Sequence, residues 1–219
     1  MVRRLTGRVL FLLFAALLCA APAFAQYNRV DVSLNGGAIF SKQTEGNNVT
    51  QTTTNGGAFL LTARLRFDSH SAVEFNYGRA GNSQLYAVPG FDFRVQSKIS
   101  QYNAAYVYSP IETRNIEPYL LGGIGGLKFN PSYEYINGFQ QTVTAVEQTQ
   151  LAFLYGGGVD YRVFTKIRYV EKLPYVSHFA VRLQYSGFIY RPPNFHQAEL
   201  VTTGHGHIAE ITLGLVFKF

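Results

Sequence analysis

From residue 30 to the end of the chain, hydrophobic and polar residues alternate with a period of two. Successive side chains of a β-strand point to opposite faces, so this period predicts strands. In residues 59–67, for example, one face carries Phe59, Leu61, Ala63, Leu65 and Phe67, and the other carries Thr62, Arg64 and Arg66. No segment after residue 30 shows the 3.6-residue repeat of an amphipathic helix. The pattern therefore predicts an all-β chain.

The alternation divides into eight predicted strands. They are residues 30–40, 59–67, 73–77, 91–108, 118–129, 148–162, 179–186 and 209–219. In residues 118–129 we assign the odd positions, from Tyr119 to Phe129, to the hydrophobic face and Lys128 to the polar face. In residues 91–108 the early hydrophobic positions have the opposite parity to the later ones. Because one extra residue reverses the alternation, we expect a bulge between Ser97 and Ser100.

The connections between these strands alternate in length. Four are long and polar, namely residues 41–56, 79–91, 130–147 and 191–207, and three are shorter, namely 68–71, 109–117 and 163–175. Long outer loops and short periplasmic turns are typical of barrels in the bacterial outer membrane. The connection at 163–175 is longer than this pattern expects, and the sequence gives no role for it.

The N-terminus has the three parts of a secretory signal peptide. Arg3, Arg4 and Arg8 precede the apolar run 9–18, and Ala23-Phe24-Ala25 supplies small residues for cleavage before Gln26. A retained transmembrane helix is the alternative, but the run is about half of the roughly 20 residues that span a bilayer. The bulky residue before Cys19 argues against a lipid anchor. We therefore predict a signal peptide at 1–25 and one outer-membrane β-barrel domain at 26–219.

Removal of the signal peptide changes the charge. Residues 1–25 hold three of the 19 basic residues and none of the 13 acidic ones, so the net charge falls from +6 to +3. This weak excess gives little support to nucleic-acid binding. The single cysteine is removed with the signal, so neither disulfides nor thiolate chemistry are expected.

Alternation alone does not say which face of the sheet is wet, and a secreted β-sandwich or a lipocalin-like barrel is the soluble alternative. The polar face is mostly Ser, Asn, Gln and Thr with few charges, which suits the crowded lumen of a narrow barrel. The chain has 15 Tyr and 18 Phe, and several lie at predicted strand ends, where membrane barrels carry aromatic girdles. These are Tyr77, Tyr108, Tyr119, Phe129, Tyr161, Tyr190, Phe217 and Phe219.

The last residues, Leu215-Val216-Phe217-Lys218-Phe219, resemble the C-terminal signature that the outer-membrane assembly machinery recognises. The segments 118–125 and 156–162, Pro-Tyr-Leu-Leu-Gly-Gly-Ile-Gly and Gly-Gly-Gly-Val-Asp-Tyr-Arg, resemble the fifth and sixth strands of the small OmpA-like barrels. This resemblance implies an eight-stranded antiparallel up-and-down transmembrane β-barrel in the bacterial outer membrane. It also implies contact with outer-membrane lipid and lipopolysaccharide, and we expect a monomer without the peptidoglycan-binding domain of some relatives.

Charged residues on the polar face are expected to point into the lumen. They are Asp31, Arg64, Arg66, Glu74, Lys128, Asp160, Arg162, Arg182, Glu210 and Lys218. If residues 68–70 form a tight turn, Arg64 lies opposite Glu74 as a cross-strand ion pair. We predict a lumen ion network of Arg64, Glu74, Asp160, Arg182 and Glu210. It would act either as a structural plug or as an ion-conducting gate.

Other candidate chemistry is weak. The glycine clusters 122–126 and 156–158 lie within strands, and they lack the helix that a phosphate-binding loop requires. His196, His205 and His207 share one long loop or its edge and are weak candidates for a metal site. Ser177 and His178 are adjacent in sequence, so on a strand they point in opposite directions and form no catalytic dyad. We assign no catalytic residue and no cofactor.

The sequence favours a structural or surface-interaction protein that presents four long loops on a rigid barrel. A narrow passive pore is the first alternative, and a lipid-modifying enzyme of the outer membrane is the second. The loops contain no motif that identifies what they bind.

Overall fold

The computed structural model describes residues 30–46, 49–88, 90–111, 113, 115–163, 178–195 and 204–219. Its long strands are β1 (Val30–Ser41), β4 (Gly56–Arg66), β5 (Ser71–Val88), β6 (Phe91–Tyr108), β7 (Ile116–Ile136), β9 (Gln148–Arg162), β10 (His178–Tyr190) and β11 (Gly206–Lys218). The short strands are β2 (Thr44–Gly46), β3 (Val49–Thr53) and β8 (Phe139–Gln141). Within these residues, no helix is both long and apolar enough to cross a membrane.

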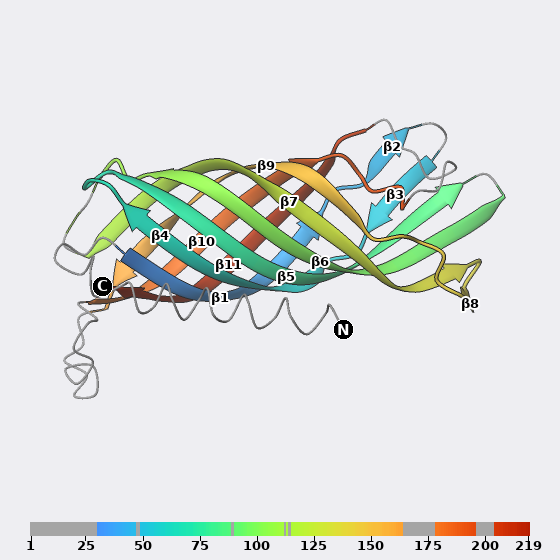
Figure 1. Ribbon diagram of the computed structural model, residues 1–219, viewed down its shortest axis with the longest axis horizontal. Coiled ribbons are helices and arrows are strands. Elements are labelled where there is room, and N and C mark those ends of the chain that lie inside the picture. The colour runs from blue at the N-terminus through green and yellow to red at the C-terminus, as the bar shows by residue number, and fades with distance from the viewer. Residues whose placement is uncertain are drawn as a thin grey trace, which may run out of the picture.

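The eight long strands form a closed antiparallel barrel (Figure 1). Each pairs with the next along the chain, and β1 pairs with β11 to close the circuit. Closure removes the free edges of the sheet, so every strand of the barrel wall has hydrogen-bonding neighbours on both sides. The prediction of an eight-stranded antiparallel barrel is confirmed.

The two ends of the barrel differ. We call the end with the tight turn 67–70 and the last residue, Phe219, the turn end; it lies at the left in Figure 1. The opposite end, with β2, β3 and β8, is the loop end. The turn between β4 and β5 closes by a hydrogen bond from the Phe67 amide to the Ser71 carbonyl, 3.0 Å long. This turn places Arg64 opposite Glu74, as its length predicts.

Much of what the sequence predicts as loop is strand. β5, β6 and β7 continue beyond the barrel wall at the loop end (Figure 1), and β2, β3 and β8 pair onto them. The result is a six-stranded sheet in the order β2-β3-β5-β6-β7-β8, which we call the loop-end sheet. The prediction of long loops at 79–91 and 130–147 was therefore wrong over most of their length. Beyond the membrane a strand needs no apolar outer face, so its alternation is weak.

The expected bulge lies on a different strand. The residues of β6 with odd numbers, from Phe93 to Val107, all face inward without interruption, and β6 pairs with β5 in continuous register. The register shifts instead between β6 and β7, where Gln96 pairs with Tyr133 and Ser97 with Pro131. Ser132 is therefore the extra residue, and it follows a proline that has no amide hydrogen to give to the ladder.

Below this bulge, the inward and outward faces of β7 are the reverse of those assigned from the sequence. Below Ser132 the odd residues face inward, so Tyr119 and Phe129 are buried in the lumen, and Leu120 and Ile124 face outward. Lys128, predicted in the lumen, is on the outer surface. Tyr190 of β10 is also buried. The placement of these three aromatic residues in a girdle was wrong. For Tyr119 and Phe129, the reason is that leucine and glycine occur at both parities of β7 and leave the choice of face open.

Candidate functional site

Among the described residues, eight charged side chains form ion pairs with one another in the lumen near the turn end. Four are basic (Arg64, Arg66, Arg182, Lys218) and four are acidic (Asp31, Glu74, Glu117, Asp160). Strands β1, β4, β5, β7, β9, β10 and β11 all contribute. The formal charges cancel within the group, which we call the charged layer.

The centre of the charged layer is a square of two arginines and two carboxylates. Arg64 Nη2 donates to Glu74 Oε2 at 2.7 Å, and Arg182 makes a two-pronged contact with Asp160 through Nε at 2.7 Å and Nη2 at 2.8 Å. The other two sides of the square, Arg64 to Asp160 and Arg182 to Glu74, are 3.7 and 3.6 Å long. All four side chains are fully buried. Each charge therefore has two partners of opposite sign, as burial in a narrow lumen requires.

An aromatic ring supports this square. The guanidinium of Arg64 lies 4.1 Å from the centre of the Tyr119 ring, and that of Arg182 lies 5.4 Å from it. The Tyr119 hydroxyl donates to Gln184 Oε1 at 2.8 Å. Gly158, on the neighbouring strand, leaves the space for this ring, because a Cβ there would lie 2.5 Å from the Tyr119 hydroxyl. The glycine cluster 156–158 thus has a packing role at this point.

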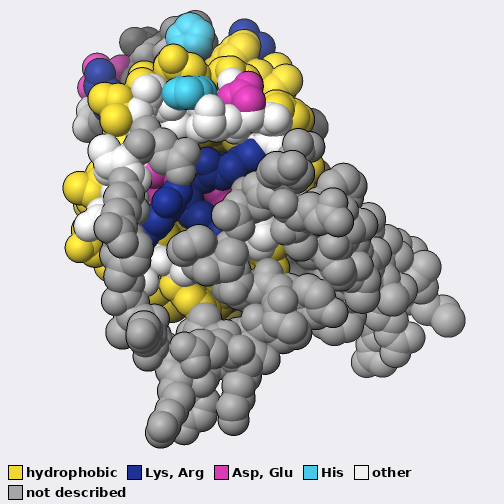
Figure 2. Space-filling view, turned by 90° about the vertical axis from the view of Figure 1, so that its left-hand side faces the viewer, with side chains coloured by type: hydrophobic (Ala, Val, Ile, Leu, Met, Phe, Trp, Pro, Cys, Tyr) yellow, Lys and Arg dark blue, Asp and Glu magenta, His cyan; other side chains and the backbone are white. Residues whose placement is uncertain are grey.

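The remaining charges lie closer to the turn end. Arg66 Nη2 contacts Asp31 at 2.8 Å and Glu117 at 2.6 Å, and Lys218 Nζ contacts Glu117 at 2.7 Å. Seen from the turn end, basic side chains line a hollow with acidic ones among them (Figure 2). Arg66 is half-buried there, whereas Lys218 is buried. Ion pairs thus fill the barrel up to this mouth.

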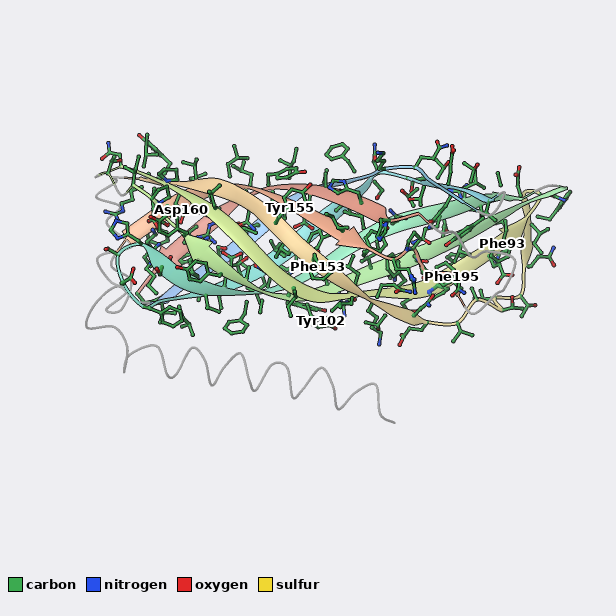
Figure 3. All side chains as sticks on the ribbon, turned by 90° about the horizontal axis from the view of Figure 1, so that it is seen from above. Phe93, Tyr102, Phe153, Tyr155, Asp160 and Phe195 are labelled. Atoms are coloured by element: carbon green, nitrogen blue, oxygen red, sulfur yellow. The ribbon has the colours of Figure 1, made fainter. Side chains whose placement is uncertain are left out.

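A second layer closes the lumen toward the loop end. It is apolar and aromatic, and its largest members are Tyr86, Phe93, Leu127, Phe129, Leu154, Phe188, Tyr190 and Phe195. The rings of Phe129 and Tyr190 stack with centres 5.7 Å apart, and Phe195 meets Tyr86 edge to face at 6.4 Å. Figure 3 shows Phe93 and Phe195 toward the loop end, far along the barrel from Asp160. We call these residues the apolar layer.

The apolar layer is continuous with the loop-end sheet. The hydroxyl of Tyr86 donates to the Pro193 carbonyl at 2.6 Å, and this bond holds the segment after β10 across the loop end of the barrel. On the other side of the mouth, Glu134 accepts from the amides of Thr144 at 2.7 Å and Ala145 at 3.0 Å. These buried contacts fix the connections to the sheet, and the lumen is filled by side chains at both levels.

Comparison with known proteins identifies the family. Residues 11–219 match the family described as "Outer membrane protein beta-barrel domain". The chain belongs to this outer-membrane β-barrel family. No curated protein matches the chain.

Solved structures share the fold of this outer-membrane barrel. The barrel of Neisserial surface protein A matches with a TM-score of 0.54 and 17% identity, over 87% of this chain and 97% of that one. Ail, the attachment invasion locus protein of Yersinia pestis, was solved with the heparin analogue sucrose octasulfate and matches with 0.45 and 14%, over 87% and 99%. The N-terminal barrel of Pseudomonas aeruginosa OprF matches with 0.45 and 13%, over 88% and 98%. At these identities the likeness concerns the fold alone.

Within this outer-membrane barrel, four of the five residues predicted as the lumen network lie together: Arg64, Glu74, Asp160 and Arg182. The fifth, Glu210, is buried in the lumen but has no ion pair among the described residues. Its Oε2 accepts from Gln101 Nε2 at 2.9 Å, and its other oxygen has no partner there. Lys128 lies outside the barrel and pairs with Glu147 at 2.7 Å.

The other candidate residues of the sequence have more limited roles in the structure. Among the described residues, no group of histidine, cysteine and acidic side chains could hold a metal ion. His205 is exposed, the Nε2 of His207 is 2.7 Å from the Tyr155 hydroxyl, and His196 lies outside the described residues. Ser177 also lies outside them. Phe217 packs edge to face on Phe179 at 5.0 Å, and the assembly role of Phe217 and Phe219 stays a prediction.

Sequence reasoning missed Glu117 and the whole apolar layer. Glu117 lies before the proline that was taken as the first residue of its strand, so it was counted in a turn. The signal for the apolar layer was present as the reversed parity at Phe93 and Val95, which marks inward-facing apolar residues rather than a bulge. An apolar lumen half contradicts the expectation that every inward face is polar.

Proposed function

We propose that this outer-membrane barrel is a surface-interaction protein that presents the loop-end sheet outside the cell. The observation that carries the proposal is that this sheet is an extension of the barrel ladder itself. β5, β6 and β7 run without interruption from the wall into the sheet. A display surface of this kind is rigid, so a partner that binds it orders few additional side chains and loops.

The composition of the sheet supports a role in contact. Phe139 of β8 is 74% exposed, and Ile136, which pairs with it across the β7–β8 ladder, is also exposed. If the loop end faces water, these apolar side chains lie outside the lipid that covers the barrel wall. Exposed apolar groups that cluster in this way are typical of surfaces that bind another molecule.

The filled lumen supports this function over a pore. The charged layer is neutralised within itself, and the apolar layer covers it toward the loop end. An eight-stranded barrel is about filled by its own side chains. We therefore expect planar bilayers containing the refolded protein to stay near background conductance, whereas steady single-channel steps would favour the pore.

Cysteine labelling tests the display, because the only cysteine of the chain is Cys19 in the predicted signal peptide. Gln140→Cys places a thiol on exposed β8, and Ser69→Cys places one in the exposed turn at the other end. On intact cells a membrane-impermeant maleimide should label only Gln140→Cys, and both variants should react after lysis. Labelling of Ser69→Cys alone would show that the turn end faces outward, and it would refute the proposal.

Binding itself can be tested with protein in lipid nanodiscs on an array of purified matrix proteins and glycans. The matched variant is Phe139→Ser with Ile136→Ser, which pair across the β7–β8 ladder and are both exposed. A ligand that binds the natural protein at least tenfold more tightly than the variant supports the proposed surface. Equal binding, or none across the array, counts against the assigned surface.

A further inference from the structure

The outward face of the barrel has an uneven charge distribution. On β1, β4, β9, β10 and β11, the described residues that face outward within the strands include no Lys, Arg, Asp or Glu. Outward-facing basic residues occur on β5, β6 and β7: Arg79, Lys98 and Lys128, with Arg94 farther out on the loop-end sheet. We call Arg79, Lys98 and Lys128 the basic rim patch.

The register brings the three residues of the basic rim patch together. Ser100 of β6 pairs with Arg79 on one side and with Lys128 on the other. Lys98 is two residues farther along β6, diagonal to both. With strands about 4.8 Å apart, the backbone positions of Arg79 and Lys128 are about 10 Å apart, and their long side chains can reach one ligand.

The patch lies where the strands leave the hydrocarbon. A transmembrane strand needs about 9–11 residues. Lys98 lies ten residues before Tyr108 and Lys128 lies ten residues after Pro118, and Tyr108 and Pro118 are near the turn end of their strands. Below the patch the outward residues are aromatic or aliphatic, including Tyr77, Tyr102 and Ile124. The rings of Tyr77 and Tyr102 are 5.2 Å apart, as expected for an interfacial belt.

The positive charge of the patch is only partly compensated by the protein. Lys128 pairs with Glu147, and Arg79 Nε donates to the neutral hydroxyl of Tyr77 at 2.6 Å. Among the described residues, neither Arg79 nor Lys98 has an ion pair. Like charges at neighbouring positions on a sheet repel each other. An anion bound between these side chains would relieve the repulsion.

The space beside the patch can admit a headgroup. A cavity of about 310 Å³ opens beside Lys98, and exposed Tyr133 and half-buried Ser132 and Gln96 also line it. Its wall therefore offers one cation together with hydroxyl and amide groups. This combination suits a phosphorylated sugar, since the cation contacts phosphate and the neutral groups bond to sugar hydroxyls.

We propose that the basic rim patch binds the phosphorylated sugar headgroup of an outer-leaflet glycolipid, with the acyl chains lying against Tyr102 and Ile124 below. This inference rests on the orientation in the proposed function, with the loop end outward. The barrel would then bind one lipid preferentially on the β5–β7 side, while the rest of its wall contacts lipid through apolar side chains alone.

Native mass spectrometry of the detergent-refolded protein, titrated with bisphosphorylated lipid A, tests the inference. The variant Arg79→Gln/Lys98→Gln/Lys128→Gln should lose about thirtyfold in affinity, because two uncompensated charges near the membrane surface are removed. The control variant Lys42→Gln/Arg191→Gln removes two exposed basic residues away from the patch and should bind like the natural protein. Anomalous migration of unboiled samples on gels verifies that both variants fold.

Two further titrations, with dephosphorylated lipid and with inorganic phosphate, distinguish a glycolipid headgroup from a simple anion. The same lipid after enzymatic removal of its phosphates should bind the natural protein and the triple variant equally. If inorganic phosphate bound as tightly as lipid A, a simple anion site would replace the headgroup assignment. Equal losses of lipid affinity in the triple and control variants would show that the lipid is attracted by general positive charge and not by the patch. No loss of affinity in the triple variant would refute the proposed site. Surface labelling at Gln140→Cys does not depend on these results, so the two proposals can fail separately.

Discussion

Removal of one carboxylate from the charged layer should strongly destabilise the barrel. Glu74 is fully buried, and its Oε2 accepts from Arg64 Nη2 at 2.7 Å and Nε at 3.0 Å. Its other oxygen accepts from Asn76 Nδ2 at 2.8 Å. In Glu74→Ala, Arg64 and Arg182 keep only Asp160 as a shared acidic partner, so the group gains an uncompensated positive charge inside the lumen.

The structure also sets the expected magnitude. Removal of one partner from a buried ion pair costs about 3–5 kcal/mol, because the remaining charge stays desolvated. The same deletion at a surface pair costs about 0–1 kcal/mol. Glu147 is 45% exposed and its partner Lys128 is 38% exposed, so this pair supplies a matched control on the outer wall. We expect Glu74→Ala to lose several times more stability than Glu147→Ala.

The assay is urea unfolding of protein reconstituted in lipid vesicles, followed by the folded band on unboiled gels. The free energy of unfolding should fall by about 3–5 kcal/mol in Glu74→Ala. The double variant Glu74→Ala/Arg64→Ala should recover part of this loss, since it removes the stranded charge with its partner. If Glu74→Ala and Glu147→Ala unfold at the same urea concentration, the charged layer contributes no more than a surface pair, and the reasoning fails.

Three further outcomes are expected. Phe129→Ala removes the ring that stacks on Tyr190 and should cost about 3–5 kcal/mol in the same unfolding assay; an unchanged midpoint would mean that the apolar layer collapses without loss. Glu134→Gln weakens the bonds from the Thr144 and Ala145 amides, so limited proteolysis of whole cells should cut residues 142–147 faster than in the natural protein. The turn carboxylate Asp68 accepts from two backbone amides that lower its pKa. The stability that Asp68 contributes is therefore present above the pKa of this carboxyl in the unfolded chain, and it declines as the pH falls through the lower pKa of the folded protein. Asp68→Asn should abolish this dependence in unfolding experiments across acidic pH.

The sequence predicted the barrel well because lipid imposes one simple rule on the outer wall. Wherever a strand crosses the hydrocarbon, its outward side chains are apolar, and Leu213, Leu215 and Phe153 obey this rule. The alternation therefore identified all eight strands and the Arg64–Glu74 register. The tight turn at 68–70 was sufficient to place that pair, since a two-residue period leaves few alternatives once a turn is fixed.

The inward faces were harder to predict because either charged and polar side chains or apolar side chains can fill the lumen. Lys128 and Phe129 are adjacent, and a polar lumen would take the lysine, whereas the structure buries the phenylalanine against Tyr190. Nothing within residues 118–129 distinguishes these choices, since Leu120, Leu121 and Ile124 allow either face to be apolar. The choice depends on rings from β5, β10 and the segment after β10, which are distant in sequence.

The two layers of the lumen support different parts of the structure. The charged layer ties strands together near the turn end through contacts such as Arg182 with Asp160. The apolar layer includes Tyr86 and Phe93, which belong to the parts of β5 and β6 that form the loop-end sheet. A polar lumen throughout would leave that sheet without a core, because its inward face would be solvated. Apolar packing in the half of the lumen near the loop end therefore extends the core of a membrane barrel into the loop-end sheet.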